Sequence, residues 1–227
     1  MPWRPHLYAF SFGTFRITSL LDAVDIRSGL AANFALGQPE ALVRQVAMAN
    51  FIDPDRYEHP FIPILIETGT KKILFDTGLG DPGGMLLAGL QEIGVGPADI
   101  DTIVLTHGHP DHTGGLLAGG SPVFTRAHYV FGAAEFDFWM HSEDVRAARL
   151  ANRDLFRRTC AKLAGRATFI NPGDEISPGI TAIDAAGHSP GLVAYRISSG
   201  AKRLLMVGYL LALCLVAAAP ALAGRCR

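Results

Sequence analysis

The stretch Thr106-His107-Gly108-His109-Pro110-Asp111-His112-Thr113-Gly114-Gly115 places three histidines and one aspartate within six consecutive positions. The residues before it, from Thr102 to Leu105, are apolar or β-branched, which predicts a buried strand. Gly108 and Pro110 are typical of a strand's end, and the two glycines that follow permit close approach of the chain. We therefore expect the polar side chains to lie on a loop at the carboxyl end of this strand.

This composition favours a metal site. Neutral imidazoles and carboxylates are the usual nitrogen and oxygen ligands of Zn²⁺ and its first-row neighbours. His107 and His109 alternate along an extended chain and can face one point, whereas Asp111 and His112 follow the proline turn and can face a second. With only 8 histidines in 227 residues, a chance cluster of three is improbable. The spacing predicts two metals, one on each pair.

At these residues the sequence resembles the metallo-β-lactamase-fold hydrolases, whose signature is H-x-H-x-D-H, and most closely their lactonase and organophosphate-hydrolase-type branch. The resemblance covers roughly residues 10–208. Alternating predicted strands and helices indicate only an α/β fold; the four-layer αβ/βα sandwich is what the resemblance implies. The stretches that support it are the signature, Lys72-Ile73-Leu74-Phe75-Asp76-Thr77-Gly78, Ala133-Ala134-Glu135-Phe136-Asp137-Phe138-Trp139 and Gly187-His188-Ser189-Pro190-Gly191.

The resemblance adds two site residues. His188 follows the predicted strand 180–184 and becomes the third imidazole of the first metal, with His107 and His109. Three protein nitrogens and one water make a catalytic zinc geometry. Asp76 ends another buried strand and is expected to support the metal ligands by accepting an imidazole N–H. The alternative for Asp76 is a turn aspartate that caps the following glycine-rich segment.

The activity that the resemblance implies is hydrolysis of an ester-type bond through metal-bound hydroxide. The expected substrate is a small molecule, a lactone of the N-acyl homoserine lactone type. Asp111 is the catalytic candidate: it binds the second ion with His112, or it alone orients the nucleophile and returns the proton to the leaving alkoxide. The expected cofactor is zinc, as one or two divalent ions, with manganese, iron or cobalt as alternatives. Phosphotriester or aryl-ester hydrolysis at the same metals is the alternative reaction.

Composition narrows the class of protein. A net charge of −1 with 18% charged residues gives no electrostatic footprint for nucleic acid. Cys160, Cys214 and Cys226 have no metal-ligand spacing and are odd in number, which favours unpaired thiols in a reducing compartment. The first residues contain no apolar core typical of a secretory signal. We therefore expect a cytoplasmic protein.

The segment Asn33–Tyr57 is predicted to be an insertion that contains a helix beginning near Pro39. In the resembling lactonases, an insertion of this kind helps to form the substrate pocket or a homodimer contact; a packed surface helix is the equal alternative. Asp22 and Asp25 precede the insertion and are expected to be solvated turn carboxylates.

The sequence departs from the family pattern after His188. The family's next strand ends in Gly-Asp, with the aspartate bridging the two metals, whereas this chain has Gly208-Tyr209, and no His, Asp or Glu follows His188. A Tyr209 phenolate is a weak substitute, since its reference pKa is ~10. We therefore expect a mononuclear or labile binuclear site. The alternative that is not an enzyme is a catalytically inactive metal-binding remnant of such a hydrolase.

Residues 209–227 are apolar and are expected not to belong to the hydrolase domain, which is assigned to residues 1–208. Residues 204–223 are twenty uncharged residues between basic flanks, about the ~20 needed to span a bilayer. Three interpretations follow: a hydrolase that lacks its final portion, a tail-anchored protein associated with a membrane, or a buried C-terminal helix. The first is favoured, because Leu204 to Val207 are needed as a core strand.

Overall fold

The computed structural model describes residues 5–35 and 37–208. These residues divide into two compact units. The larger contains residues 5–23 and 61–208, and the smaller contains the described residues between Val24 and Pro60.

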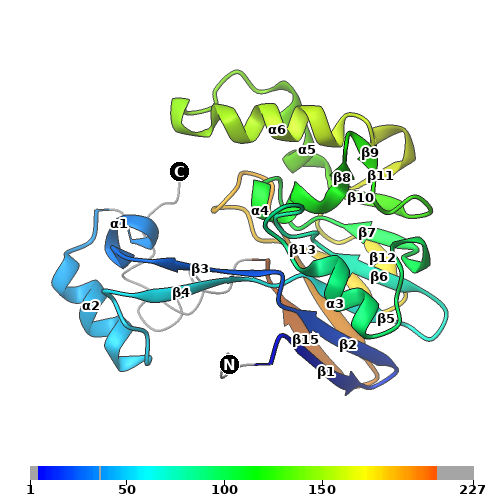
Figure 1. Cartoon of the computed structure of the whole chain (residues 1–227), viewed down its shortest axis with the longest axis horizontal. Helices are drawn as coiled ribbons and strands as arrows, with labels where there is room; N and C mark the ends of the chain where they lie inside the picture. Colours follow the sequence, from blue (N-terminus) through cyan, green and yellow to red (C-terminus); the bar gives the residue numbers. More distant parts are fainter. Residues whose placement is uncertain (1–4, 36, 209–227) are drawn as a thin grey trace. The chain divides into compact units, whose positions relative to one another are not determined.

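A seven-stranded sheet in the order β1-β2-β5-β6-β7-β10-β11 is the frame of the larger unit (Figure 1). Strands β1, β2, β5 and β6 pair antiparallel. Strands β6, β7, β10 and β11 pair parallel, so their carboxyl ends meet at one edge. The strands are β1 Leu7–Phe12, β2 Phe15–Leu20, β5 Ile64–Glu67, β6 Lys72–Phe75, β7 Thr102–Val104, β10 His128–Gly132 and β11 Ala167–Ile170.

Both faces of this sheet are buried, which explains the continuous apolar runs of its central strands. Side chains alternate between the faces: Leu74 and Ile103 lie in one core, whereas Ile73 and Val104 lie in the other. The predicted strand 102–105 is thus confirmed as β7, extended by the buried Leu105.

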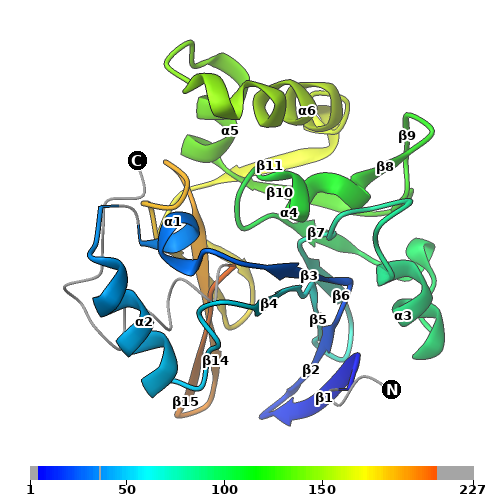
Figure 2. The same cartoon turned by 60° about the vertical axis from the view of Figure 1, so that its left-hand side comes forward.

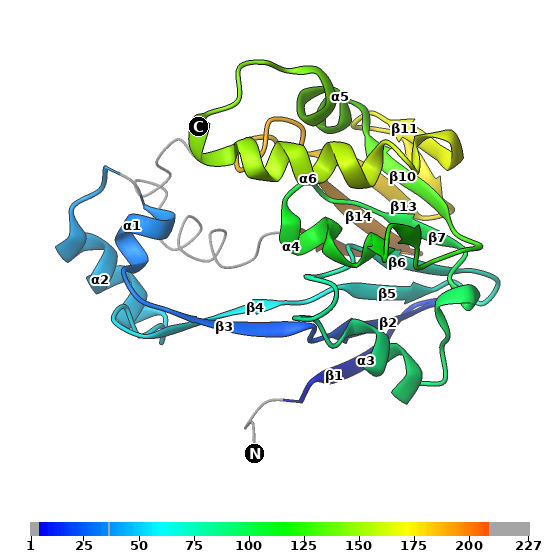
Figure 3. The same ribbon diagram turned by 45° about the horizontal axis from the view of Figure 1, so that its top comes forward.

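Three helices cover the first face: α3 Leu86–Glu92, α5 Ala133–His141 and α6 Leu150–Cys160. Trp139 of α5 and Phe156 of α6 are buried in the same core as Leu74. Helices α5 and α6 lie side by side (Figure 3). The short α4, Pro110–Thr113, lies within the histidine-rich stretch.

A four-stranded antiparallel sheet, in the order β12-β13-β14-β15, packs against the second face. Its strands are β12 Glu175–Ser177, β13 Ile180–Asp184, β14 Val193–Ser199 and β15 Lys202–Met206, of which β14 and β15 lie side by side in Figure 2. The larger unit is thus built on a helix layer and two main sheets, and the predicted α/β metallo-β-lactamase-like class is confirmed.

The remaining elements of the larger unit are short. A two-stranded ribbon pairs β8 Leu117–Ala118 with β9 Ser121–Pro122. Single 3₁₀ turns connect the longer elements at Pro97–Asp99, Gly114–Leu116, Ala147–Arg149 and Ala164–Arg166.

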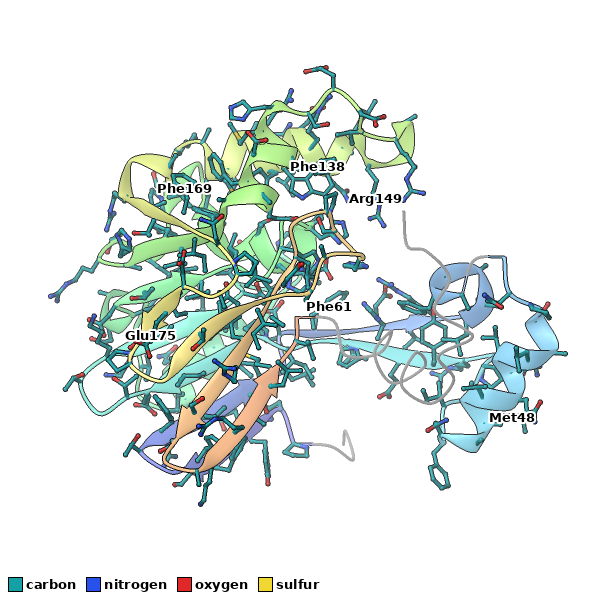
Figure 4. The ribbon with its side chains drawn as sticks, turned by 180° about the vertical axis from the view of Figure 1, so that it is seen from behind. Met48, Phe61, Phe138, Arg149, Phe169 and Glu175 are labelled. Carbon is teal, nitrogen blue, oxygen red and sulfur yellow. The ribbon has the colours of Figure 1, made fainter. Side chains whose placement is uncertain are left out.

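Strands β3 Ala23–Arg27 and β4 Tyr57–Phe61 pair with each other. The smaller unit begins within β3, ends within β4 and carries α1 Leu30–Phe34 and α2 Glu40–Ala49. Helix α2 begins where the sequence predicted. Val43 and Ala47 are buried in the unit's own core, whereas Met48 (Figure 4) is exposed. The pocket and homodimer roles of this insertion stay predictions.

Two expectations need correction. Asp22 is not a solvated turn carboxylate: it is fully buried and accepts backbone N–H bonds from Leu79 and Leu86. Residues 204–206 lie in β15, so the prediction of a bilayer-spanning helix over 204–223 is wrong for these three residues. No helix among the described residues is long and apolar enough to cross a membrane. The rest of the predicted tail, including Tyr209, Cys214 and Cys226, lies outside the described residues.

Cys160 is fully buried, and burial raises the pKa of its thiol well above the usual range. Because the thiolate is the reactive form, we expect Cys160 to resist iodoacetamide in the native chain and to react after denaturation. Peptide mass spectrometry distinguishes it from the other two cysteines. Alkylation of native Cys160 at the rate of a free thiol would contradict this packing.

Candidate metal centre

The candidate site lies where the chain leaves several strands. Asp76 directly follows β6, and the histidine-rich loop follows β7 after Leu105. His188 lies on the loop between β13 and β14. A backbone bond from Val193 to the carbonyl of Thr106, 2.9 Å long, joins the start of β14 to the β7 loop. Parallel pairing and this cross-link explain why residues so distant in sequence meet.

The structure brings His107, His109 and His188 together. Their ligand nitrogens all lie within 4.8 Å of one another. His109 Nδ1 is 3.0 Å from His107 Nε2 and 2.9 Å from His188 Nε2. Two nitrogens bound ~2.05 Å from one tetrahedral ion would be about 3.3 Å apart. The three nitrogens could therefore hold one ion and leave a fourth position open.

The pKa values of His107 and His109 favour the neutral imidazole. Burial lowers the pKa of His107 well below its usual value, and the neighbouring imidazoles and Arg149 lower it further. Burial, His188 and Arg149 lower the pKa of His109 to about 3. Both imidazoles are thus neutral at pH 7, which is the form that binds metals. Arg149 ends the 3₁₀ turn before α6 (Figure 4).

His112 and Asp111 form a second pair beside the first. His112 Nε2 is 3.4 Å from Asp111 Oδ2, and His112 Nδ1 is 2.7 Å from Asp76 Oδ2. Burial lowers the pKa of His112, but the charges and hydrogen bonds of Asp76 and Asp111 outweigh it and raise the pKa to about 10. Burial raises the pKa of Asp111, but the hydrogen bond and charge of His112 hold it well below its usual range.

Asp76 contacts several polar groups behind the histidines. One carboxylate oxygen accepts the backbone N–H of Thr106 at 2.9 Å. The other accepts the Thr106 hydroxyl at 2.8 Å and faces the His112 Nδ1–H. Its backbone adopts a φ of 60°, a left-handed conformation that Asp and Asn tolerate better than most residues.

Thr106 orients the first histidine. Its hydroxyl donates to Asp76, so its lone pairs face His107 Nδ1, 3.1 Å away. His107 then donates from Nδ1 and keeps the lone pair of Nε2 for a ligand. In the same way, donation from His112 Nδ1 to Asp76 leaves His112 Nε2 directed toward Asp111.

Sequence reasoning assigned no role to Glu135, although the stretch that contains it contributed to the family resemblance. Its side chain is buried, and it accepts hydrogen bonds from the loop of His107 and His109 and from the loop of His188. The sequence offers only a weak signal for it, a glutamate among mostly apolar residues in the stretch 133–139.

Comparisons with known proteins agree with this geometry. A family model described as the metallo-beta-lactamase superfamily matches residues 63–214. A probable metallo-hydrolase of Methanocaldococcus jannaschii is 33% identical over 74 residues, which are 33% of this chain and 34% of that protein. The chain thus matches about a third of the length of this curated relative.

Solved structures show the same fold. AidC, a dizinc quorum-quenching lactonase in complex with its product N-hexanoyl-L-homoserine, has a TM-score of 0.79 and 23% identity, with 93% of this chain and 83% of AidC covered. The hydrolase AbOPH of the beta lactamase superfamily has a TM-score of 0.78 and 26% identity, with 89% and 73% covered.

The fold and the histidine cluster agree with the match to this superfamily. The chain belongs to the metallo-β-lactamase superfamily, as the signature predicted.

Asp76→Asn tests the network behind the histidines. Asparagine tolerates the same backbone conformation, but its NH₂ group cannot accept the bonds that Oδ2 receives from Thr106 and His112. We expect the free energy of unfolding of the metal-free chain to fall by about 2–4 kcal/mol, because buried donors lose their acceptor. Denaturant titration measures it.

Asp137→Asn is the matched control. It replaces an exposed carboxylate that faces His141 at 3.0 Å, and we expect a change within about 0.5 kcal/mol. An Asp76→Asn chain that unfolds at the same denaturant concentration as the wild type would contradict the network.

Proposed function

We propose that this protein is a metal-dependent lactone hydrolase with substrates of the N-acyl homoserine lactone type. The observation that carries the proposal is the convergence of His107, His109 and His188 from two separate loops on one point. Three imidazoles with an open fourth position are a donor set typical of a hydrolytic metal site. The likeness to AidC supports the lactone class through its fold.

In this proposal, His107, His109 and His188 hold the first ion, which we take to be zinc. Tetrahedral sites of three imidazoles suit zinc, and manganese, iron and cobalt are the alternatives. We assign the second ion to His112 and Asp111, whose Nε2 and Oδ2 atoms lie 3.4 Å apart, and this ion has to displace the proton that the pair shares in the metal-free chain. Because these are only two ligands among the described residues, we propose one tightly bound ion and a second that is weak or absent.

The chemistry supplied by a bound divalent ion is activation of a water molecule and polarisation of the substrate's carbonyl oxygen. Asp111 performs the proton transfer. We assign it the proton of the attacking water because its carboxylate lies beside the histidine cluster, with Oδ2 3.4 Å from His112 Nε2. Asp111 then returns this proton to the alkoxide that leaves when the lactone ring opens.

His112 and Asp76 position Asp111. Hydrogen bonding to Asp76 through Nδ1 fixes the ring of His112, whose other nitrogen faces the Asp111 carboxylate. This chain of contacts runs from the end of β6 to the reacting proton. The small-molecule substrate, the cytoplasmic location and the homodimer remain part of the proposal and rest on the sequence.

The experiment compares hydrolysis of N-hexanoyl-L-homoserine lactone with hydrolysis of a phosphotriester by the zinc-loaded chain. We expect a higher kcat/KM for the lactone, and a loss of at least about 100-fold in His188→Ala, because one of three ligands is removed. His128→Ala is the matched control: this exposed histidine lies at the amino end of β10, and its side chain contacts the Thr168 hydroxyl at 2.8 Å, away from the clustered histidines.

A higher kcat/KM for the phosphotriester would contradict the substrate class. A metal-loaded chain that hydrolyses neither substrate would favour the inactive metal-binding remnant. Loss of activity in His128→Ala equal to that in His188→Ala would contradict the assignment of His188.

A further inference from the structure

Glu135 is a buried carboxylate for which the proposed reaction has no use. It lies in the first turn of α5, and its residue exposure is 3%. None of the ion pairs among the described residues involves Glu135. Burying a charge without a counterion is costly unless hydrogen bonds compensate.

Four donors compensate, and they come from three segments. Oε1 accepts the backbone N–H of Gly108 at 2.8 Å, the indole N–H of Trp139 at 2.6 Å and the hydroxyl of Ser189. Oε2 accepts the backbone N–H of Gly191 at 2.8 Å. Gly108 lies between His107 and His109, and Ser189 directly follows His188. A single carboxylate therefore bonds both loops that carry the three clustered imidazoles.

Both loops have a glycine where they meet α5. A Cβ on Gly191 would lie 2.1 Å from the backbone nitrogen of Glu135. A Cβ on Gly108 would lie 2.5 Å from Trp139 and 2.8 Å from Phe156. Side chains at either position would push the loops away from Glu135, so the glycines are what allow both N–H groups to reach one carboxylate.

Trp139 connects Glu135 to His109 through a second set of contacts. Its indole N–H donates to Glu135 one helical turn earlier, and its ring packs edge-on against His109 with centroids 5.6 Å apart. Glu135 thus holds the backbone beside His109 directly and the ring of His109 through Trp139.

We propose that Glu135 is a positioning residue that fixes His188 relative to the His107–His109 pair and thereby sets the affinity and geometry of the metal site. The inference rests on the proposed function, since it takes these three imidazoles as the ligands. Glu135 acts through the two loop backbones and touches neither the ligand nitrogens nor, in this account, the substrate.

The test is a cobalt(II) titration of the full-length apo chain, followed by visible absorption, for wild type and Glu135→Gln. The amide keeps the volume and one acceptor oxygen, but its NH₂ group must face at least one of the four donors. We expect the Kd for cobalt to rise about 10-fold or more, as for residues that orient metal ligands, and the tetrahedral absorption band to weaken at saturation.

Asp22→Asn is the matched control. Asp22 is also a fully buried carboxylate that accepts two backbone N–H bonds, each 2.8 Å long, but the segment it holds, Leu79 to Leu86, carries no predicted ligand. A merely structural role for Glu135 would lower the Tm of both variants and leave cobalt binding unchanged in both. Positioning predicts altered cobalt affinity and spectrum in Glu135→Gln alone.

Ser189→Ala keeps the test decisive if Glu135→Gln does not fold. It removes one hydroxyl donor beside His188, and we expect a smaller rise in the cobalt Kd, about 3-fold. Wild-type affinity and spectrum in Glu135→Gln, or in Ser189→Ala where only that variant folds, would overturn the inference.

A wild-type chain that takes up no cobalt would overturn this inference together with the metal site. Normal cobalt uptake without lactone hydrolysis would overturn only the proposed substrate.

Discussion

The parallel pairing of β6, β7 and β10 is the constraint on which the rest of the site depends. Because these strands run in one direction, Asp76, the histidine-rich loop and Glu135 all leave the sheet at the same edge. The second sheet packs on the opposite face from the helices, and the start of β14 bonds Thr106 directly, which brings the loop of His188 to this edge. The fold therefore assembles the site from segments that are more than a hundred residues apart, from Asp76 to His188.

Two buried carboxylates, Asp76 and Glu135, then hold the histidine-bearing loops in a fixed arrangement through hydrogen bonds. Asp76 binds Thr106 and His112, so it orients His107 through the Thr106 hydroxyl and fixes the ring of His112 directly. Glu135 accepts bonds from both ligand loops. Neither carboxylate is bonded to a lysine or an arginine among the described residues. Their charges are compensated by backbone, hydroxyl, indole and imidazole donors, so the cost of burying them depends on the loops being in place.

Much of this arrangement was predictable from the sequence, because the signals are local. A strand signal followed by alternating histidines located the β7 loop, and the family resemblance correctly indicated the superfamily and the α/β class. The roles of Asp22 and Glu135 were not predicted. Several of their hydrogen-bond donors are distant along the chain: Leu86 is 64 residues from Asp22, and Ser189 and Gly191 are 54 and 56 residues from Glu135. A carboxylate in a turn has the same local sequence signal whether it is solvated or satisfied by distant backbone groups.

Zinc content combined with X-ray absorption at the zinc edge tests the central claim most directly, that three imidazoles from two loops bind one ion. After dialysis, we expect about one zinc per chain, with a spectrum dominated by imidazole nitrogens ~2.0–2.1 Å from the metal. Retention of no zinc, or of zinc with an oxygen-dominated shell, would contradict the claim. Retention of nearly two zinc ions per chain would contradict the expectation of a single tight site.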